Sequence, residues 1–339
     1  MGVEVEDSAV AKVIPLRGEG RGGVARGAST DGSRGARDPG VPPVVHQLRT
    51  GGPPDEADHT ALADHVAEVL TFLRRRVTGD YEVDDYGFDP HLNSSVILPA
   101  LRPVFEKWFR VEVSGVENLP ADGAALLVAN HAGTVPVDGL MLSVAVHDHH
   151  PQHRPTRMLA ADLVFQTPLL GSFSRKAGHT LACHPDADSL LREGALVTVF
   201  PEGFKGVGKP FADRYKLQRF GRGGFVTSAL RTGTPIIPVS IVGSEEIYPK
   251  LADIKPLARL LGLPYFPITP LFPLLGPLGA VPLPSKWHIA FGEPIATDGY
   301  DEQAADDPMI TFDLTDQVRE RIQQTLYTLL ATRRNVFFG

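Results

Sequence analysis

The chain has 339 residues, of which 42% are hydrophobic and 22% charged, values that are ordinary for a globular protein with a sizeable core. Fibrous and wholly disordered proteins are therefore excluded. The 33 Lys and Arg residues against 40 Asp and Glu residues give a formal net charge of -7, so the chain lacks the global basic field that binds nucleic acid. Its single cysteine, Cys183, excludes an internal disulfide and a cysteine-based metal cluster.

The N-terminal third changes character along its length. Residues 1–55 are rich in Gly, Pro, Ser and Arg, and such a segment cannot bury enough surface to offset its ordering entropy, so we predict a disordered leader. Helical periodicity begins near Asp58, and residues 56–112 are predicted to form amphipathic helices. The stretch 94–113 mixes aromatic and aliphatic side chains with cations, which is typical both of a membrane-surface helix and of a helix packed on a core. Pro103 is expected in a first turn.

The remainder, residues 113–339, reads as an α/β domain with a C-terminal helix. Short apolar runs separated by turns and helical patches predict buried strands that alternate with helices and carry ligand loops at their ends. The expected strands lie at 124–130, 195–200, 235–243 and 287–295, and the last helix is expected from about Asp313.

The stretch 256–284 is rich in proline and dense in leucine and phenylalanine. It is too broken for a transmembrane helix, and no apolar run in the chain reaches the roughly 18–20 residues that a spanning helix needs. We expect a buried loop over the core. A lip that dips into a membrane, or a wall for an acyl chain, is the alternative.

The strongest chemical signal is the sequence NHAGTVPVD, which directly follows the expected strand 124–130. Histidine suits general base catalysis near neutral pH, and a nearby carboxylate can fix its tautomer and stabilise the imidazolium. Gly133 and Pro136 make the intervening backbone a turn, so Asp138 is predicted to fold back toward the ring of His131.

Two further blocks carry cations. The block FPEGFKG, residues 200–206, also lies at a strand end, where Lys205, with Lys209 behind it, is expected to offer charge to an anionic head group. A block that lies between the other two in the chain contains the adjacent cations Arg175 and Lys176.

The three blocks, in their order along the chain and followed by TPIIPV, resemble the glycerolipid acyltransferase superfamily over roughly residues 95–297. The resemblance implies a helix-flanked mixed β-sheet, preceded by an N-terminal helical pair on the membrane surface. It also implies an acyl thioester donor, either acyl-CoA or acyl-ACP, and a glycerolipid hydroxyl as the acceptor. Six residues separate His131 from Asp138 where the family usually has four, and this longer loop resembles a divergent branch related to diacylglycerol acyltransferases.

The resemblance assigns His131 as the catalytic base and Asp138 as its partner carboxylate. The substrate-binding residues that it implies are Phe200, Pro201, Glu202, Gly203, Lys205, Arg175, Lys176 and Arg219. In the family, the second block commonly ends in an arginine, and here His184 stands in its place. Arg222 is a further residue that could supply the missing positive charge for a phosphorylated acceptor. No metal and no bound cofactor is implied beyond the acyl co-substrate. The expected partners are a membrane lipid surface and the two substrates, with the protein peripheral or monotopic on the cytoplasmic face and without a transmembrane span.

Three alternatives stay open. A serine-type lipid hydrolase needs an activated nucleophile, for which Ser172 and Ser174 are the available candidates. Zinc chemistry is suggested by the histidines at 147–150 together with His153, although consecutive residues seldom converge on one tetrahedral ion. A catalytically silent membrane-binding protein of the same fold is the third alternative.

Overall fold

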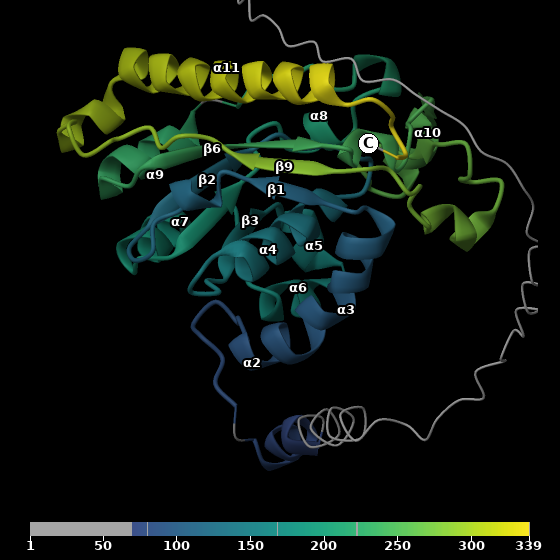
Figure 1. The fold of residues 1–339 in the computed structure, drawn as a ribbon, viewed down its shortest axis with the longest axis horizontal. Coiled ribbons are helices and arrows are strands. Elements are labelled where there is room, and N and C mark those ends of the chain that lie inside the picture. The colour runs from purple at the N-terminus through teal and green to yellow at the C-terminus, as the bar shows by residue number, and fades with distance from the viewer. Residues whose placement is uncertain (1–69, 80, 168, 222, 339) are drawn as a thin grey trace, which may run out of the picture. The chain divides into compact units, whose positions relative to one another are not determined.

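The computed structural model describes residues 70–79, 81–167, 169–221 and 223–338, so the predicted leader at 1–55 lies outside the described residues. The described residues belong to one compact unit, 61–339. Its centre is a seven-stranded sheet in the order β1-β9-β6-β2-β5-β3-β4 (Figure 1). The strands are β1 (Glu112–Ser114), β2 (Ala125–Ala129), β3 (Thr156–Ala160), β4 (His179–Leu181), β5 (Leu196–Val199), β6 (Ile236–Val242) and β9 (His288–Phe291).

The sheet is mixed, which confirms the predicted α/β class. Strands β6, β2, β5, β3 and β4 run parallel to one another, whereas β9 is antiparallel to β6 and pairs in parallel with β1. All residues of β2 and β6 are buried, as expected for parallel strands that are covered on both faces. The apolar runs at 124–130, 195–200, 235–243 and 287–295 correspond to β2, β5, β6 and β9.

Helices cover the two faces of the sheet. On one face, Leu127 packs in a core with residues of α4 (Val137–His149), and on the other, Leu126 packs with residues of α7 (His184–Arg192), α9 (Gly224–Thr232) and α11 (Pro308–Thr332). Figure 1 shows α11 above the sheet and α4 below it. The shorter helices are α5 (Asp162–Gln166), α6 (Leu170–Lys176) and α8 (Phe204–Val207), with 3-10 turns at Val116–Asn118, Phe211–Asp213, Ser244–Glu246 and Glu302–Asp306.

The C-terminal helix α11 begins earlier than predicted, at Pro308 rather than near Asp313. The side chain of Asp307 caps the helix by accepting a hydrogen bond from the backbone N–H of Met309, and Pro308 occupies the first turn. Both are ordinary helix-start signals, so the true start was readable from the sequence.

Residues 90–108 form one helical run with π-helical turns. It consists of α2 (Pro90–Leu92), a π turn (Asn93–Ile97), α3 (Leu98–Pro103) and a second π turn (Val104–Trp108). Pro103 lies inside this run, so its predicted place in a first turn is wrong. The chain stays helical past the proline because the π turn makes longer hydrogen bonds, such as Phe109 N–H to the Val104 carbonyl.

The helical run 90–108 packs on the sheet. Leu98, Phe105 and Phe109 are buried in the core on the α4 side, and the ring of Phe109 stacks on Trp287 at 4.6 Å between centroids. Of the two interpretations of this stretch, the structure shows the core-packed helix, and a contact with a membrane stays a prediction.

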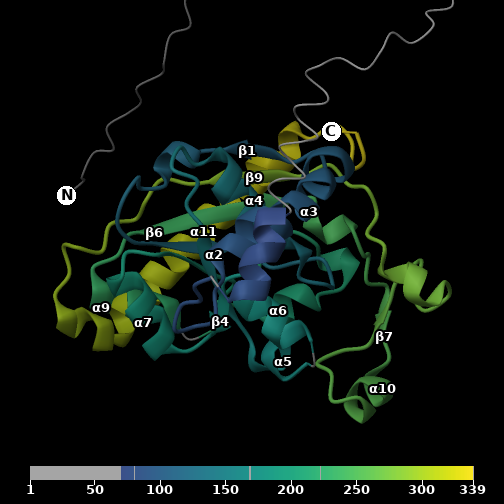
Figure 2. The ribbon, with the colours of Figure 1, turned by 90° about the horizontal axis from the view of Figure 1, so that it is seen from below.

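The segment 251–281 contradicts the expectation of a buried loop. It contains β7 (Ala252–Asp253) paired with β8 (Pro267–Ile268), helix α10 (Lys255–Leu260) and a 3-10 helix (Gly276–Ala280). Large apolar side chains of this segment are exposed, namely Leu251, Leu260, Leu261, Leu263, Leu274, Leu275, Leu278 and Val281. Figures 1 and 2 place α10 at the end of this unit opposite α7 and α9. Among the described residues, no helix combines the length and the hydropathy that crossing a bilayer requires.

Candidate active site

The sheet topology brings the sequence blocks together. Because β2 and β5 are parallel neighbours, the loops that follow them leave the same edge of the sheet. The loop after β2 carries His131, and the loop after β5 carries the FPEG turn, residues 200–203. The side-chain amide of Asn130 joins this edge to β6, since it donates to the carbonyl of Ile241 at 3.0 Å and accepts from its N–H at 2.7 Å.

His131 and Asp138 form a hydrogen-bonded pair, as the turn between them predicts. The distance from His131 Nδ1 to Asp138 Oδ2 is 2.8 Å, and the same carboxylate oxygen accepts the backbone N–H of Ala132 at 2.9 Å. Asp138 is fully buried in the first turn of α4, where the helix dipole favours a negative charge. The imidazole stacks on the ring of Phe200 at 4.4 Å between centroids.

This pairing fixes the chemistry of the imidazole. With Nδ1–H donated to the carboxylate, Nε2 carries the lone pair that can accept a proton. No side chain or backbone group in the described part of the chain hydrogen-bonds Nε2, and the side chain of His131 is 14% exposed. The ring of His131 is therefore held by Asp138, with Nε2 unpaired among the described residues.

The backbone of the His131 loop is held in an unusual conformation. Gly133 and Thr134 have φ of 99° and 64°, and a Cβ atom on Gly133 would lie 2.6 Å from the carbonyl oxygen of Ser244. Thr134 donates its hydroxyl to the carbonyl of Tyr248 at 2.9 Å, and its own carbonyl accepts the hydroxyl of Tyr265 at 2.5 Å. The segment that follows β6 thus clamps the loop.

Glu202 joins the FPEG turn to the His131 loop. It is buried, and its Oε1 accepts the backbone N–H of His131 at 2.9 Å. Its Oε2 accepts the N–H of Gln218 at 2.6 Å and lies 3.2 Å from Lys209 Nζ. Both carboxylate oxygens are thus bonded within the protein, which makes Glu202 a positioning residue in this structure. A contact with substrate stays a prediction for it.

The expectation that Lys209 offers its charge to a head group is wrong. Lys209 is buried, and its ammonium lies 3.2 Å from the carboxylates of both Glu202 and Glu245. One lysine therefore faces two carboxylates. Burial is the main reason that the pKa of Glu245 is raised to about 7, with the charge of Glu202 as a further cause that the ammonium of Lys209 opposes.

A cavity of about 490 Å³ lies beside the FPEG turn and brings several predicted residues together. Pro201, Glu202, Lys205 and Arg219 all line it, and the side chains of Lys205 and Arg219 are exposed. Lys205 comes from α8 and Arg219 from the loop before α9, and because both line this cavity, an anionic group in it would be near both. Gly203, with a positive φ of 53°, lies in this turn but does not line the cavity.

The other predicted cations do not share this cavity. The guanidinium of Arg175, on α6, stacks over the ring of Phe165 at 4.6 Å. The carbonyl of Lys176 accepts the N–H of Asp89 at 3.2 Å. Helix α6 leads into β4, so its C-terminal end lies toward the edge of the sheet opposite His131. Arg222 lies outside the described residues.

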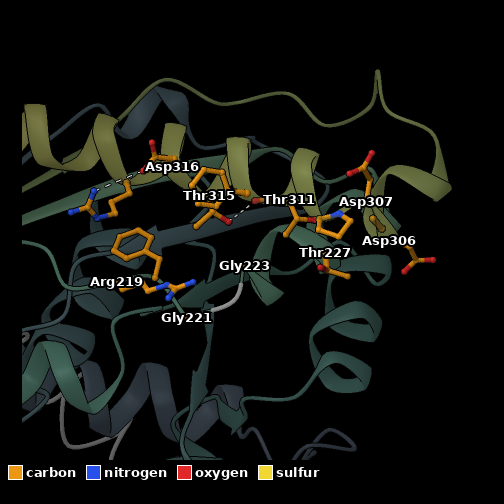
Figure 3. A pocket seen from close by; sticks show the side chains of 14 residues that line it. Arg219, Gly221, Gly223, Thr227, Asp306, Asp307, Thr311, Thr315 and Asp316 are labelled. Carbon is orange, nitrogen blue, oxygen red and sulfur yellow. Dashed lines mark hydrogen bonds and ion pairs between the residues drawn. The ribbon is translucent and has the colours of Figure 1, made fainter.

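A larger cavity of about 610 Å³ lies next to this one and shares Arg219 and Gly221 with it. Figure 3 shows α11 on one side of this cavity and Arg219, Gly221 and Gly223 on the other, with Asp306, Asp307 and Asp316 along the helix side. Neither cavity is lined by His131. The imidazole therefore lies outside both of these cavities, and Glu202, which accepts the backbone N–H of His131, lines the smaller one.

The serines and histidines on which the alternative functions depend make hydrogen bonds that do not fit those functions. The hydroxyl of Ser172 donates to the carbonyl of Leu169 at 3.1 Å, and no described histidine hydrogen-bonds Ser172 or Ser174. His147 bonds Asp148, and His153 bonds the carbonyl of His147. Among the described residues, no three His, Cys, Asp or Glu side chains are arranged to hold a metal ion.

Comparison with known proteins gives one family. Residues 110–242 match the Acyltransferase family. The chain is 69% identical over 284 residues to an uncharacterized protein of Mycobacterium tuberculosis, across 84% of this chain and 79% of that protein. It is 27% identical over 162 residues to a 1-acyl-sn-glycerol-3-phosphate acyltransferase of Chlamydomonas reinhardtii, across 44% of each chain. It is also 27% identical over 195 residues to a human DGAT1/2-independent enzyme synthesizing storage lipids, across 56% of this chain and 55% of that protein.

The range that matches the Acyltransferase family, 110–242, contains both the NHAGTVPVD and the FPEG block. The chain is an acyltransferase and belongs to the glycerolipid acyltransferase superfamily.

Proposed function

We propose that this enzyme transfers a fatty acyl group from an acyl thioester, acyl-CoA or acyl-ACP, to the free hydroxyl of a glycerolipid such as lysophosphatidate. The observation that carries the proposal is the 2.8 Å pair of His131 and Asp138, in which Nε2 of the imidazole has no partner among the described residues. A base in this state can activate a hydroxyl directly, without a covalent acyl-enzyme.

The reaction is a single direct transfer. Nε2 of His131 takes the proton of the acceptor hydroxyl as the oxygen attacks the thioester carbonyl, and the new C–O bond forms a tetrahedral intermediate. The C–S bond then breaks and the thiolate leaves, which needs little acid assistance because a thiol has an ordinary pKa of about 8.5. Asp138 holds the imidazole through Nδ1 and stabilises the imidazolium, which gives its proton to the departing sulfur.

The acceptor is proposed to be phosphorylated. Lys205 and Arg219 line the cavity beside the FPEG turn, and a guanidinium and an ammonium together suit a phosphate monoester. Pro201 and Gly203 keep the backbone of this turn tight, and Phe200 holds the imidazole by stacking. Arg175 and Lys176 are proposed to contribute only at a distance, since neither lines this cavity.

The substrates also favour a place at a membrane. The acceptor is a lipid, so we propose a peripheral or monotopic enzyme on the cytoplasmic face of a membrane, with the helices of residues 56–112 on the lipid surface. In the described part of this region, Leu70, Leu73 and Val77 expose apolar side chains. A helix with such side chains binds the interface between head groups and acyl chains.

A substrate screen tests the proposal. The purified chain is incubated with one labelled acyl-CoA, or the matching acyl-ACP, against lysophosphatidate, monoacylglycerol and diacylglycerol. We expect transfer to lysophosphatidate, with a higher KM for this acceptor in Lys205→Gln and Arg219→Gln but an unchanged KM for monoacylglycerol. Release of free fatty acid without dependence on the acceptor, together with labelling by a serine-directed probe, would identify a hydrolase instead.

A further inference from the structure

Exposed apolar side chains gather at the edge of the sheet that carries His131. Strands β2, β3, β5 and β6 are parallel, so the loops that follow them all leave this edge. Each of the connections that start here exposes large apolar side chains: Val135 after β2, Leu169 and Leu170 at the start of α6 after β3, Phe204 after β5, and the leucines of 251–281 after β6. The active-site edge is therefore ringed by apolar groups from four separate loops.

The segment after β6 is the largest part of this ring. Residues 260–285 contain no charged side chain, although much of the segment is exposed. Leu260, Leu274 and Leu278 are 80%, 84% and 67% exposed. An exposed surface of this size without charges is unfavourable in water and marks a place where something else covers it.

This segment is attached to the catalytic loop. The hydroxyl of Tyr265 bonds the carbonyl of Thr134, three residues after His131, and the ring of Tyr265 lies under the ammonium of Lys250 at 4.6 Å. The carbonyl of Tyr248, three residues before the segment, accepts the hydroxyl of Thr134. Whatever binds the exposed leucines is therefore held close to the base.

Charge indicates which kind of partner covers the surface. Lys255 and Arg259, both exposed on α10, flank the uncharged stretch on one side, and exposed Lys205 lies beside Phe204. Leucines next to exposed cations suit a surface with acyl chains below and anionic head groups above. We infer that the loops at the active-site edge, with 260–281 as the main element, insert into the surface of a lipid bilayer and hold His131 at the level of the head groups.

This inference rests on the proposed function in one respect, namely that the acceptor whose hydroxyl His131 activates is a lipid. It is tested by binding to vesicles and not by turnover alone. The full chain is sedimented with vesicles of phosphatidylcholine mixed with phosphatidylglycerol. The variant Leu274→Glu with Leu278→Glu alters the segment. The matched control, Met309→Glu with Tyr327→Glu, alters apolar side chains on α11 that are 67% and 59% exposed.

We expect the Leu274→Glu/Leu278→Glu variant to bind vesicles at least about tenfold more weakly, because burying one leucine is worth roughly that factor. The control variant binds as the unaltered protein does. In the transfer assay, the segment variant loses turnover of acceptor held in vesicles and keeps turnover of a short-chain acceptor that is dispersed as single molecules. This split separates a lost membrane contact from a damaged site.

The outcomes keep the two proposals apart. Weaker vesicle binding supports the lipid surface even where no transfer to lysophosphatidate is found, so a failure of the proposed function is seen separately. Unchanged vesicle binding by the segment variant overturns the inference. A change from dimer to monomer in light scattering, with vesicle binding unchanged, also overturns it and assigns the surface to a second copy of the chain.

Discussion

Two regions contact the His131 loop, and they differ in which side chains they bury: one buries charged groups and the other exposes apolar ones. Behind the loop, Glu202, Lys209 and Glu245 place three charged side chains in the interior. Beside the loop, residues 260–285 carry no charge, yet they expose leucines to solvent. Buried charges cost solvation, and exposed leucines leave apolar surface in water. Neither arrangement is favourable for the fold alone, and both contact the His131 loop, so we interpret both as serving the proposed site.

The division of work between the two regions follows from their chemistry. The buried cluster bonds backbone groups, as Glu202 does with the N–H of His131 and Glu245 with the N–H of Tyr215, so it fixes loop positions. The uncharged segment bonds the same loop through Tyr265, and its exposed leucines suit an apolar partner. If the polar cluster holds the site, removing one of its charges should cost more stability than removing an exposed charge.

The largest effect is expected from Asp138→Asn. The amide cannot hold the imidazole as a carboxylate does, nor stabilise its charged form, so kcat for acyl transfer should fall by about 10²–10⁴-fold with a small change in KM. Steady-state kinetics with saturating acyl donor measure this. A kcat equal to that of the unaltered enzyme would remove Asp138 from the mechanism.

The next effect concerns stability rather than rate. Lys209→Met leaves Glu202 and Glu245 buried without a counter-charge, and breaking such a group should lower the free energy of unfolding by about 3–5 kcal/mol. Denaturant unfolding measures this. The matched control is Lys205→Met, whose side chain is exposed, and we expect it to stay within about 0.5 kcal/mol of the unaltered protein. Equal losses in the two variants would contradict the role of the buried cluster.

The third effect is a pH dependence from Glu245, whose pKa is raised to about 7 by burial. Between the ordinary carboxyl pKa and about 7, the folded protein holds a proton that the unfolded chain releases, so stability falls as pH rises through this window. Glu245→Gln should remove this part of the loss, on the order of 2 kcal/mol. Unfolding curves at pH 5.5 and pH 8 for both proteins measure it. An identical pH slope in the two proteins would show that Glu245 does not hold this proton.

The smallest effect is expected at a partly exposed pair outside the cluster. Arg102 on α3 makes two hydrogen bonds, of 2.7 and 2.8 Å, to Asp148 on α4, and this partner lowers the pKa of Asp148 to about 2. Arg102→Ala should lower the free energy of unfolding by about 1 kcal/mol, because solvent screens the pair. The contribution is present above the ordinary carboxyl pKa and is lost as pH falls toward 2. A loss as large as that in Lys209→Met would erase the distinction between the two kinds of charge.

The site was readable from the sequence where local rules decide it. The ends of β2 and β5 follow from apolar runs, and the turn at Gly133 and Pro136 predicts that Asp138 reaches His131. The spatial meeting of the FPEG turn with the His131 loop follows from parallel strands ending at one edge.

The rest depends on contacts between distant parts of the chain. Lys209 looks like a surface cation, and only the fold reveals Glu245, which is 36 residues away, beside it. Pro103 looks like a helix start, but the packing of Phe105 and Phe109 keeps the helix going through a π turn. A run of leucines and prolines at 256–284 gives no local sign of whether it covers a core or faces outward, since both positions suit the same residues.

The role of His131 as the base is tested most directly by one comparison of rates. Labelled acyl transfer from acyl-CoA to lysophosphatidate is measured for the unaltered enzyme and for His131→Ala, with circular dichroism confirming that both are folded. Loss of the base predicts a rate lower by at least about a hundredfold. A His131→Ala enzyme that transfers acyl groups at nearly the unaltered rate would contradict the proposed mechanism.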